Sequence, residues 1–102
     1  MFKNLNIFEF SDYRHYLREW IAEARRAKIF SLTRLAEVAQ VHPTFLSHVL
    51  AGTKHLSLEQ AMAISDHLGH TKVEQDYLVI LINLDRAGTK ALQNYLDHRP
   101  AV

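Results

Sequence analysis

The chain has 102 residues, a formal net charge of +1 and no cysteine. This length is typical of one domain that buries its own core. The lack of cysteine excludes disulfides and thiolate metal sites and favours a cytoplasmic protein. No apolar signal segment opens the sequence, and the longest apolar run, Tyr77 to Ile82, is too short to cross a bilayer. With only three glycines and two prolines to make tight turns, composition predicts a small, soluble, helical protein without a membrane partner.

The charge is unevenly divided along the chain. Residues 13–55 carry seven Lys and Arg against three acids, a net charge of +4, whereas residues 56–102 have a net charge of −2. Four of the seven histidines also fall in the basic stretch. A polyanion partner for the first half is one interpretation, and ordinary scatter of surface charge explains this count equally well.

Helical periodicity predicts the first two helices. A strongly amphipathic helix is expected near residues 12–27, with Ser11 as its N-cap. Its apolar stripe consists of Tyr13, Tyr16, Leu17, Trp20, Ile21 and Ala24. A second helix begins after Ser31, and its inward residues are Leu32, Leu35, Ala36 and Ala39.

Capping signals predict the helices that follow. A third helix begins at Pro43, a residue favoured at the first helical position, with His42 as its N-cap and Gly52 at its end. Ser57 and Gln60 form a capping box that opens a fourth helix. This fourth helix ends at Gly69.

The C-terminal third is predicted to hold one long helix and a shorter stretch. Thr71 and Glu74 form another capping box, which opens a fifth helix through about Arg86. Gly88 separates it from a last helical stretch with Ala91, Leu92, Tyr95 and Leu96. We therefore expect residues 1–102 to form one all-α domain, a bundle of five or six helices.

The segment SLTRLAEVAQVHPTFLSHVLAGTKHLSLEQAMAISDHLG, over roughly residues 30–69, resembles the helix-turn-helix of the λ repressor and Cro family. The shared pattern has an inward alanine in the first helix, an apolar residue at the centre of the turn, and apolar residues three apart in the second helix; here these are Ala36, Val41, Leu46 and Val49. A Gly-basic loop and a capped Leu-Ser-Leu-Glu helix follow. The resemblance implies a helix-turn-helix at about residues 31–51 that places its second helix in the major groove of double-stranded DNA.

One position departs from this family. The turn in relatives usually begins with a glycine in the left-handed region, and here the residue is Gln40. A non-glycine residue in that conformation costs about 1 kcal/mol, which the motif tolerates.

The full chain also resembles the N-terminal region of longer bacterial predicted regulators. The shared features are the opening Phe-Ser-Asp-Tyr-Arg, Phe45 before Leu46-Ser47, and the Leu56-Ser57 that starts the next helix. A larger C-terminal part follows in those relatives. The resemblance therefore implies either a fragment that lacks a C-terminal effector domain or a natural short version.

Carried over residue by residue, the resemblance assigns base reading to side chains near the start of the third helix: Thr44, Phe45, Ser47 and His48. Thr44 and Ser47 can bond to base edges or phosphates, and His48 can donate to a guanine acceptor. Each of the three also fits an ordinary exposed helical residue. The ring of Phe45 either meets a thymine methyl or folds back onto the first helix, and the sequence leaves both open.

Contacts to DNA phosphates are expected from a cluster of basic and polar residues: Lys28, Arg34, Thr53, Lys54 and His55. Basic side chains and small hydroxyls commonly bind phosphate oxygens and position a protein on the duplex. For any single member a solvated surface role is the simpler interpretation. The prediction therefore depends on the cluster.

Enzymatic and metal-dependent functions are less well supported. Ser47 and His48 are adjacent on a helix and face different ways, so they cannot act as nucleophile and base. His67 and His70, with Asp66 beside them, suggest a metal, but the fourth helix is expected to end between the two histidines and no further ligand has a suitable spacing. No catalytic residue, metal or cofactor is predicted. The serious alternative to DNA binding is a protein-interaction module with the same helix-turn-helix shape.

The fifth helix is apolar around most of its circumference. Its inward stripe is expected to be Val73, Tyr77, Ile80, Leu81 and Leu84. This leaves Leu78, Val79 and Ile82 for the interface of a homodimer, unless the last helical stretch or a C-terminal domain covers them. A homodimer is favoured because a two-fold pair reads two half-sites one helical turn apart.

Overall fold

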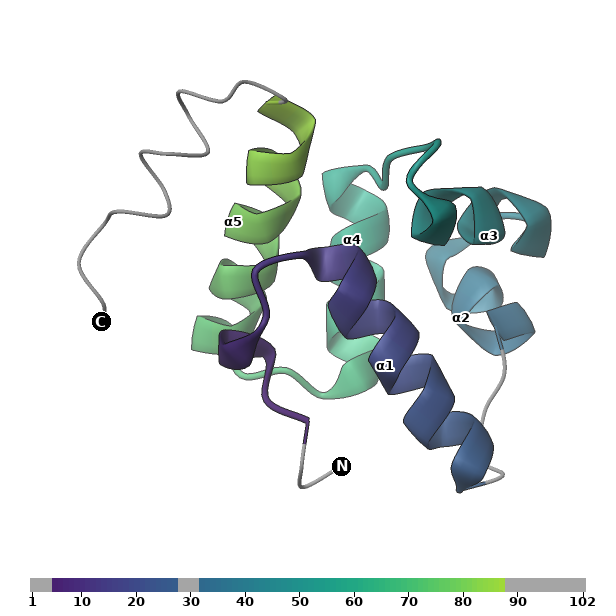
Figure 1. The fold of residues 1–102 in the computed structure, drawn as a ribbon, viewed down its shortest axis with the longest axis horizontal. Helices are drawn as coiled ribbons and strands as arrows, with labels where there is room; N and C mark the ends of the chain where they lie inside the picture. Colours follow the sequence, from purple (N-terminus) through teal and green to yellow (C-terminus); the bar gives the residue numbers. More distant parts are fainter. Residues whose placement is uncertain (1–4, 28–31, 88–102) are drawn as a thin grey trace.

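A computed structural model describes residues 5–27 and 32–87. Over these ranges the chain forms a 3-10 turn and five α-helices, without strands (Figure 1). The elements are η1 (Ile7–Glu9), α1 (Tyr13–Arg26), α2 (Leu32–Ala39), α3 (Pro43–Ala51), α4 (Leu58–Leu68) and α5 (Lys72–Ala87). The expected all-α fold is confirmed. Lys28 and the last helical stretch expected after Gly88 lie outside the described residues.

The helices surround a single hydrophobic core. In Figure 1, α1 lies in front of α4, α5 flanks them on one side, and α2 and α3 lie on the other. α2 packs against α3 and α4, α4 packs against α5, and α1 contacts both α3 and α5. The buried apolar residues include Ile7, Tyr13, Tyr16, Leu17, Trp20, Ile21, Ala24, Leu35, Ala36, Ala39, Leu46, Val49, Leu56, Ala61, Ile64, Leu68, Leu78, Leu81 and Ile82. No helix in these described ranges has the length and hydropathy needed to span a membrane.

Among the described helix N-termini, those of α3, α4 and α5 follow the predicted capping signals and that of α1 does not. Ser57 and Gln60 form the predicted capping box, and Thr71 and Glu74 exchange the same pair of bonds. Nδ1 of His42 accepts a hydrogen bond from the backbone N–H of Thr44 at 3.1 Å, so the predicted histidine N-cap is confirmed.

The exception is the start of α1. The prediction of Ser11 as its N-cap is wrong: Asp12 caps the helix and accepts from the backbone N–H of Arg14 at 2.9 Å. Serine and aspartate are both favoured N-cap residues, and a carboxylate has the further advantage of a favourable interaction with the helix dipole.

In the described chain, α2, α3 and α4 end in the same backbone motif. After each helix, one N–H bonds three residues back and the next N–H bonds five residues back, which satisfies carbonyls that the helix leaves unpaired. The residue at the bend has a positive φ, +95° at Gly52 and +77° at Gly69. After α2 this residue is Gln40, with φ +58°. The predicted left-handed conformation of Gln40 is therefore confirmed. The other two bend residues are glycines, so Gln40 is the one of the three for which a positive φ strains the backbone.

The face that α5 buries differs from the predicted one. Leu78 and Ile82, expected at a homodimer interface, are only 1% and 0% exposed and belong to the core. Val73, expected to face inward, is 65% exposed. The assignment of Leu78 and Ile82 to a dimer interface is therefore wrong. A helix that is apolar on most sides fits more than one rotation, and packing against α4 selects the rotation that buries Leu78, Leu81 and Ile82.

Candidate nucleic-acid interface

α2, the turn that follows it and α3 form a docked helical pair. Ala36 is fully buried, and its carbonyl accepts a hydrogen bond from the N–H of Val41 at 2.9 Å. Val41 is partly buried and packs against the core from the turn. From α3, Leu46 and Val49 are both 0% exposed. Because these two residues anchor one side of α3, the opposite side of the helix faces solvent.

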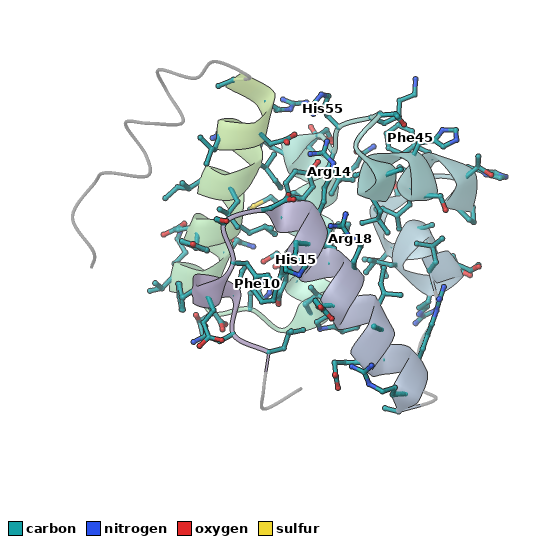
Figure 2. The ribbon with its side chains drawn as sticks, in the orientation of Figure 1. Phe10, Arg14, His15, Arg18, Phe45 and His55 are labelled. Atoms are coloured by element: carbon teal, nitrogen blue, oxygen red, sulfur yellow. The ribbon has the colours of Figure 1, made fainter. Side chains whose placement is uncertain are left out.

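The predicted base-reading residues lie on this outer side of α3. Thr44, Ser47 and His48 are all exposed, and they occupy the first two turns of the helix. Phe45 is different: it is partly buried and packs against the hydrophobic core (Figure 2). Its packing favours the alternative in which the ring folds back onto the protein.

The predicted phosphate-binding residues have different surroundings. Lys54 is exposed and makes no ion pair within residues 5–27 and 32–87. Arg34 is also exposed and lies 3.5 Å from Glu37 on the same helix, a weak pairing at the surface. Thr53 donates its single hydroxyl proton to the carbonyl of His48 at 3.1 Å. Its hydroxyl therefore serves to end α3, which differs from the phosphate contact expected of it.

The loop between α3 and α4 is attached to the rest of the fold by Arg14. This arginine is 7% exposed, and each of its three guanidinium nitrogens has a different partner. Nε donates to the carbonyl of Val49 at 2.6 Å, Nη2 donates to the carbonyl of Lys54 at 2.9 Å, and Nη1 donates to the carboxylate of Asp85. Burial alone lowers the pKa of Arg14, but the hydrogen bond to Asp85 and the nearby Tyr13 outweigh it and raise the pKa above its ordinary value.

His55 shares the carboxylate that Arg14 uses. Its Nδ1 lies 3.0 Å from Oδ2 of Asp85, so the imidazole approaches α5 through one nitrogen. Figure 2 shows Arg14 and His55 near each other, between the end of α5 and the loop after α3. The side chain of His55 is 51% exposed, so the residue remains at the surface of the loop.

Sequence reasoning counted Arg14 in the basic charge and in the shared Phe-Ser-Asp-Tyr-Arg segment, but assigned no contacts to it. A signal was present, because Arg14 is spaced three and seven residues from Leu17 and Ile21 and so lies along the apolar stripe of α1. A charged residue in such a stripe is expected to be buried with partners. The identity of those partners, 35 to 71 residues further along the chain, could not be read from that spacing.

An open hollow adjoins the outer face of α3. It has a volume of about 450 Å³ and lies between α1, α2 and the second half of α3. Its lining consists of Arg18, Ile21, Ala22, Arg25, Leu32, Ser47, Leu50 and Ala51. Arg18 donates to the carbonyl of Leu50 at 2.7 Å. The hollow thus places two exposed arginines of α1 beside Ser47.

A second polar cluster lies at the turn between α4 and α5. The hydroxyl of Tyr16 is 2.8 Å from Nε2 of His70, and Oγ of Ser65 is 2.8 Å from Nδ1 of the same ring. Burial lowers the pKa of His70 below its ordinary value of 6.5, with Glu74 opposing. Burial also raises the pKa of Tyr16 to about 12, assisted by Glu74. The cluster is therefore neutral near pH 7. Over residues 5–27 and 32–87, no three potential ligands come together at a metal-binding distance.

The chain matches the helix-turn-helix family over residues 21–75, which is more than half of its length. The matched region contains α2, the turn at Gln40, α3 and α4. Comparison with curated proteins and with solved structures gives no significant match. With its docked α2–α3 pair and its family match, the chain belongs to the λ repressor/Cro-like helix-turn-helix family.

Proposed function

We propose that this protein is a sequence-specific, double-stranded-DNA-binding transcriptional regulator of the cytoplasm that reads the major groove with α3. Membership of a helix-turn-helix family supports DNA binding in general. The observation that carries the specific proposal is the exposure of Thr44, Ser47 and His48 on the outer side of a helix whose inner side is anchored in the core. Side chains of this size and polarity can reach base edges in the major groove.

Backbone contacts would come from both flanks of α3. Lys54 is exposed on the loop at its C-terminal end, and Arg34 is exposed on α2. Arg18 and Arg25 border the hollow beside Ser47 and add positive charge on the side of α1. Cations on both sides of a reading helix position it on the duplex without reading sequence themselves.

The test is a triple alanine substitution at Thr44, Ser47 and His48. Binding to a selected duplex should weaken by several kcal/mol, at about 1–3 kcal/mol for each good base contact, while binding to random DNA is retained. Lys54→Ala is the matched control, because loss of a phosphate contact should weaken both duplexes equally. If the triple variant keeps its preference for the selected duplex, α3 is not the reading helix.

A homodimer is part of the same proposal, with a revised interface. Gln75 of α5 donates a hydrogen bond to Asp66 of α4 at 3.3 Å. Met62 lies one turn before Asp66 and Val79 lies one turn after Gln75, so Met62 and Val79 should also lie side by side. Met62 is 41% exposed and Val79 is partly exposed. Leu58, a further turn along α4, is 40% exposed. This apolar strip would allow two copies to present their α3 helices to successive half-sites.

Sedimentation equilibrium over micromolar concentrations tests the homodimer. Met62→Glu should shift the molecular mass toward the monomer, whereas Thr33→Glu on the exposed side of α2 should not. A wild-type mass fixed at 11.8 kDa would exclude the dimer.

A further inference from the structure

The strongest candidate for a further functional element is the ion pair between Arg14 and Asp85. Arg14 lies on α1 and Asp85 near the end of α5, and both fall outside residues 21–75 of the family match. Their side chains are 9% and 27% exposed. The pair is therefore an addition, made by this chain's flanking helices, to the helix-turn-helix unit itself.

The contacts of Arg14 converge on one part of that unit. The carbonyl of Val49 belongs to the last turn of α3, and it accepts from Arg14 in addition to the N–H of Gly52. The carbonyl of Lys54 lies in the following loop. Because the guanidinium is planar and rigid, two donations from one such group fix the spacing between these two carbonyls. Arg14 thereby sets where the loop leaves α3.

Asp85 completes the arrangement from the other side. One of its oxygens accepts a hydrogen bond from Nη1 of Arg14, and the other lies 3.0 Å from Nδ1 of His55. The carboxylate thus holds the guanidinium in place and also holds a loop side chain. The side chains of Lys54 and His55 are both exposed on the loop attached in this way.

We propose that Arg14 and Asp85 are positioning residues for DNA binding, which hold the loop between α3 and α4 so that Lys54 and His55 meet the phosphate backbone. This inference rests on the proposed function, since it assigns the phosphate contacts to a specific loop of the same site. Neither Arg14 nor Asp85 touches DNA. Their effect on affinity passes through the loop, and α5 thereby becomes part of the DNA-binding apparatus.

A double-mutant cycle between Asp85 and Lys54 tests the proposal. These side chains do not touch each other in the structure, so independent effects would multiply. Asp85→Asn should weaken binding to duplex DNA roughly three- to tenfold and make the salt dependence shallower by about one unit, which corresponds to one lost phosphate contact. Lys54→Ala should then have little further effect in the Asp85→Asn background.

Asp76→Asn is the matched control, because it makes the same change of charge on the same helix. Asp76 is exposed and pairs with Lys72 at 2.6 Å, away from the loop. Its DNA affinity should stay within twofold of wild type, with the salt dependence unchanged. All variants are compared below their melting transitions, as monitored by circular dichroism. Should Asp85→Asn not fold, Asp85→Glu keeps the charge, displaces the carboxylate, and should show the same coupling to Lys54 in weaker form.

Two outcomes would overturn the proposal in distinguishable ways. If wild-type protein shows no salt-dependent DNA binding, the proposed function fails and the positioning role fails with it. If wild type binds DNA but the folded Asp85 variants keep full affinity, or their effects multiply with that of Lys54→Ala, the ion pair serves stability alone and only the positioning role is lost.

Discussion

α1 contributes to two polar clusters of opposite character. Arg14 forms a charged cluster with Asp85 and His55 beside the loop that follows α3. Two residues further on, Tyr16 forms a neutral cluster with Ser65 and His70 at the turn between α4 and α5. The first cluster adjoins the exposed face of the helix-turn-helix, whereas in the second Tyr16 and Ser65 are buried and His70 is partly buried. α1 therefore holds the loop after α3 through charged contacts, and it holds the turn between α4 and α5 through neutral hydrogen bonds.

Removing the charged cluster should have the largest effect on stability. Arg14→Met removes the arginine from Asp85 and from the carbonyl of Lys54, whereas the carbonyl of Val49 keeps its bond from the N–H of Gly52. Breaking a buried ion pair costs about 3–5 kcal/mol, and the partial exposure of Asp85 places the expected loss near the lower end. Urea denaturation measures it. A decrease of less than about 1 kcal/mol in the free energy of unfolding would mean that water replaces the arginine and that the ion pair does not stabilise the fold.

Breaking the neutral cluster should lower the free energy of unfolding by a smaller amount. Tyr16→Phe removes one hydroxyl and leaves Nε2 of His70 without its partner at 2.8 Å. A buried polar group left unsatisfied costs about 1–3 kcal/mol, and no uncompensated charge is created. The same urea experiment should therefore rank Tyr16→Phe below Arg14→Met. A reversed ranking would contradict the distinction between the two clusters.

The neutral cluster should also make folding stability depend on pH. Burial lowers the pKa of His70, so the unfolded chain binds its proton more readily than the folded chain does. The stability contributed by neutral His70 is fully present above its ordinary pKa of 6.5 and is lost as the pH falls below that value. Melting temperatures between pH 8 and pH 5.5 should therefore fall more for wild type than for His70→Gln. Parallel curves would show that folding does not change the pKa of His70.

A change outside both clusters should have the smallest effect. Gln40→Gly relieves the left-handed conformation at φ +58° but also gives the unfolded chain more freedom. The net gain in unfolding free energy should be about 0.5 kcal/mol, measured against Gln40→Ala, which keeps the strain. Neither substitution should alter the pH dependence that His70 causes. Destabilisation by Gln40→Gly would indicate that the glutamine side chain makes a contact worth more than the strain.

The helix-turn-helix region was predictable from sequence because its signals are local. Pro43 with the His42 cap, the Ser57–Gln60 capping box and the glycine after α3 each act within a few residues, and the structure reproduces them. The family resemblance added Gln40 at the bend, whose left-handed backbone is confirmed. The predicted N-cap of α1, Ser11, was wrong by one residue, because the neighbouring Asp12 is an equally favoured cap type.

The rest depended on contacts between distant parts of the chain. The rotation of α5 was wrong because Leu78 and Ile82 on one face and Ile80 and Leu84 on another are similarly apolar, and only packing against other helices separates them. The pairing of Arg14 with Asp85 spans 71 residues and leaves no local trace. The roles of the exposed residues on α3 remain predictions, because exposure permits base contacts without specifying them.

The proposal that this helix-turn-helix binds DNA is tested most directly by the salt dependence of wild-type binding to duplex DNA. Fluorescence anisotropy titrations at several salt concentrations between 50 and 200 mM give the slope of log affinity against log salt. With two to four phosphates neutralised by residues such as Lys54 and Arg34, the expected slope is about −2 to −4, at −0.9 for each phosphate. A slope near zero, or no measurable binding at the lowest salt, would contradict DNA binding and favour a protein partner for the same fold.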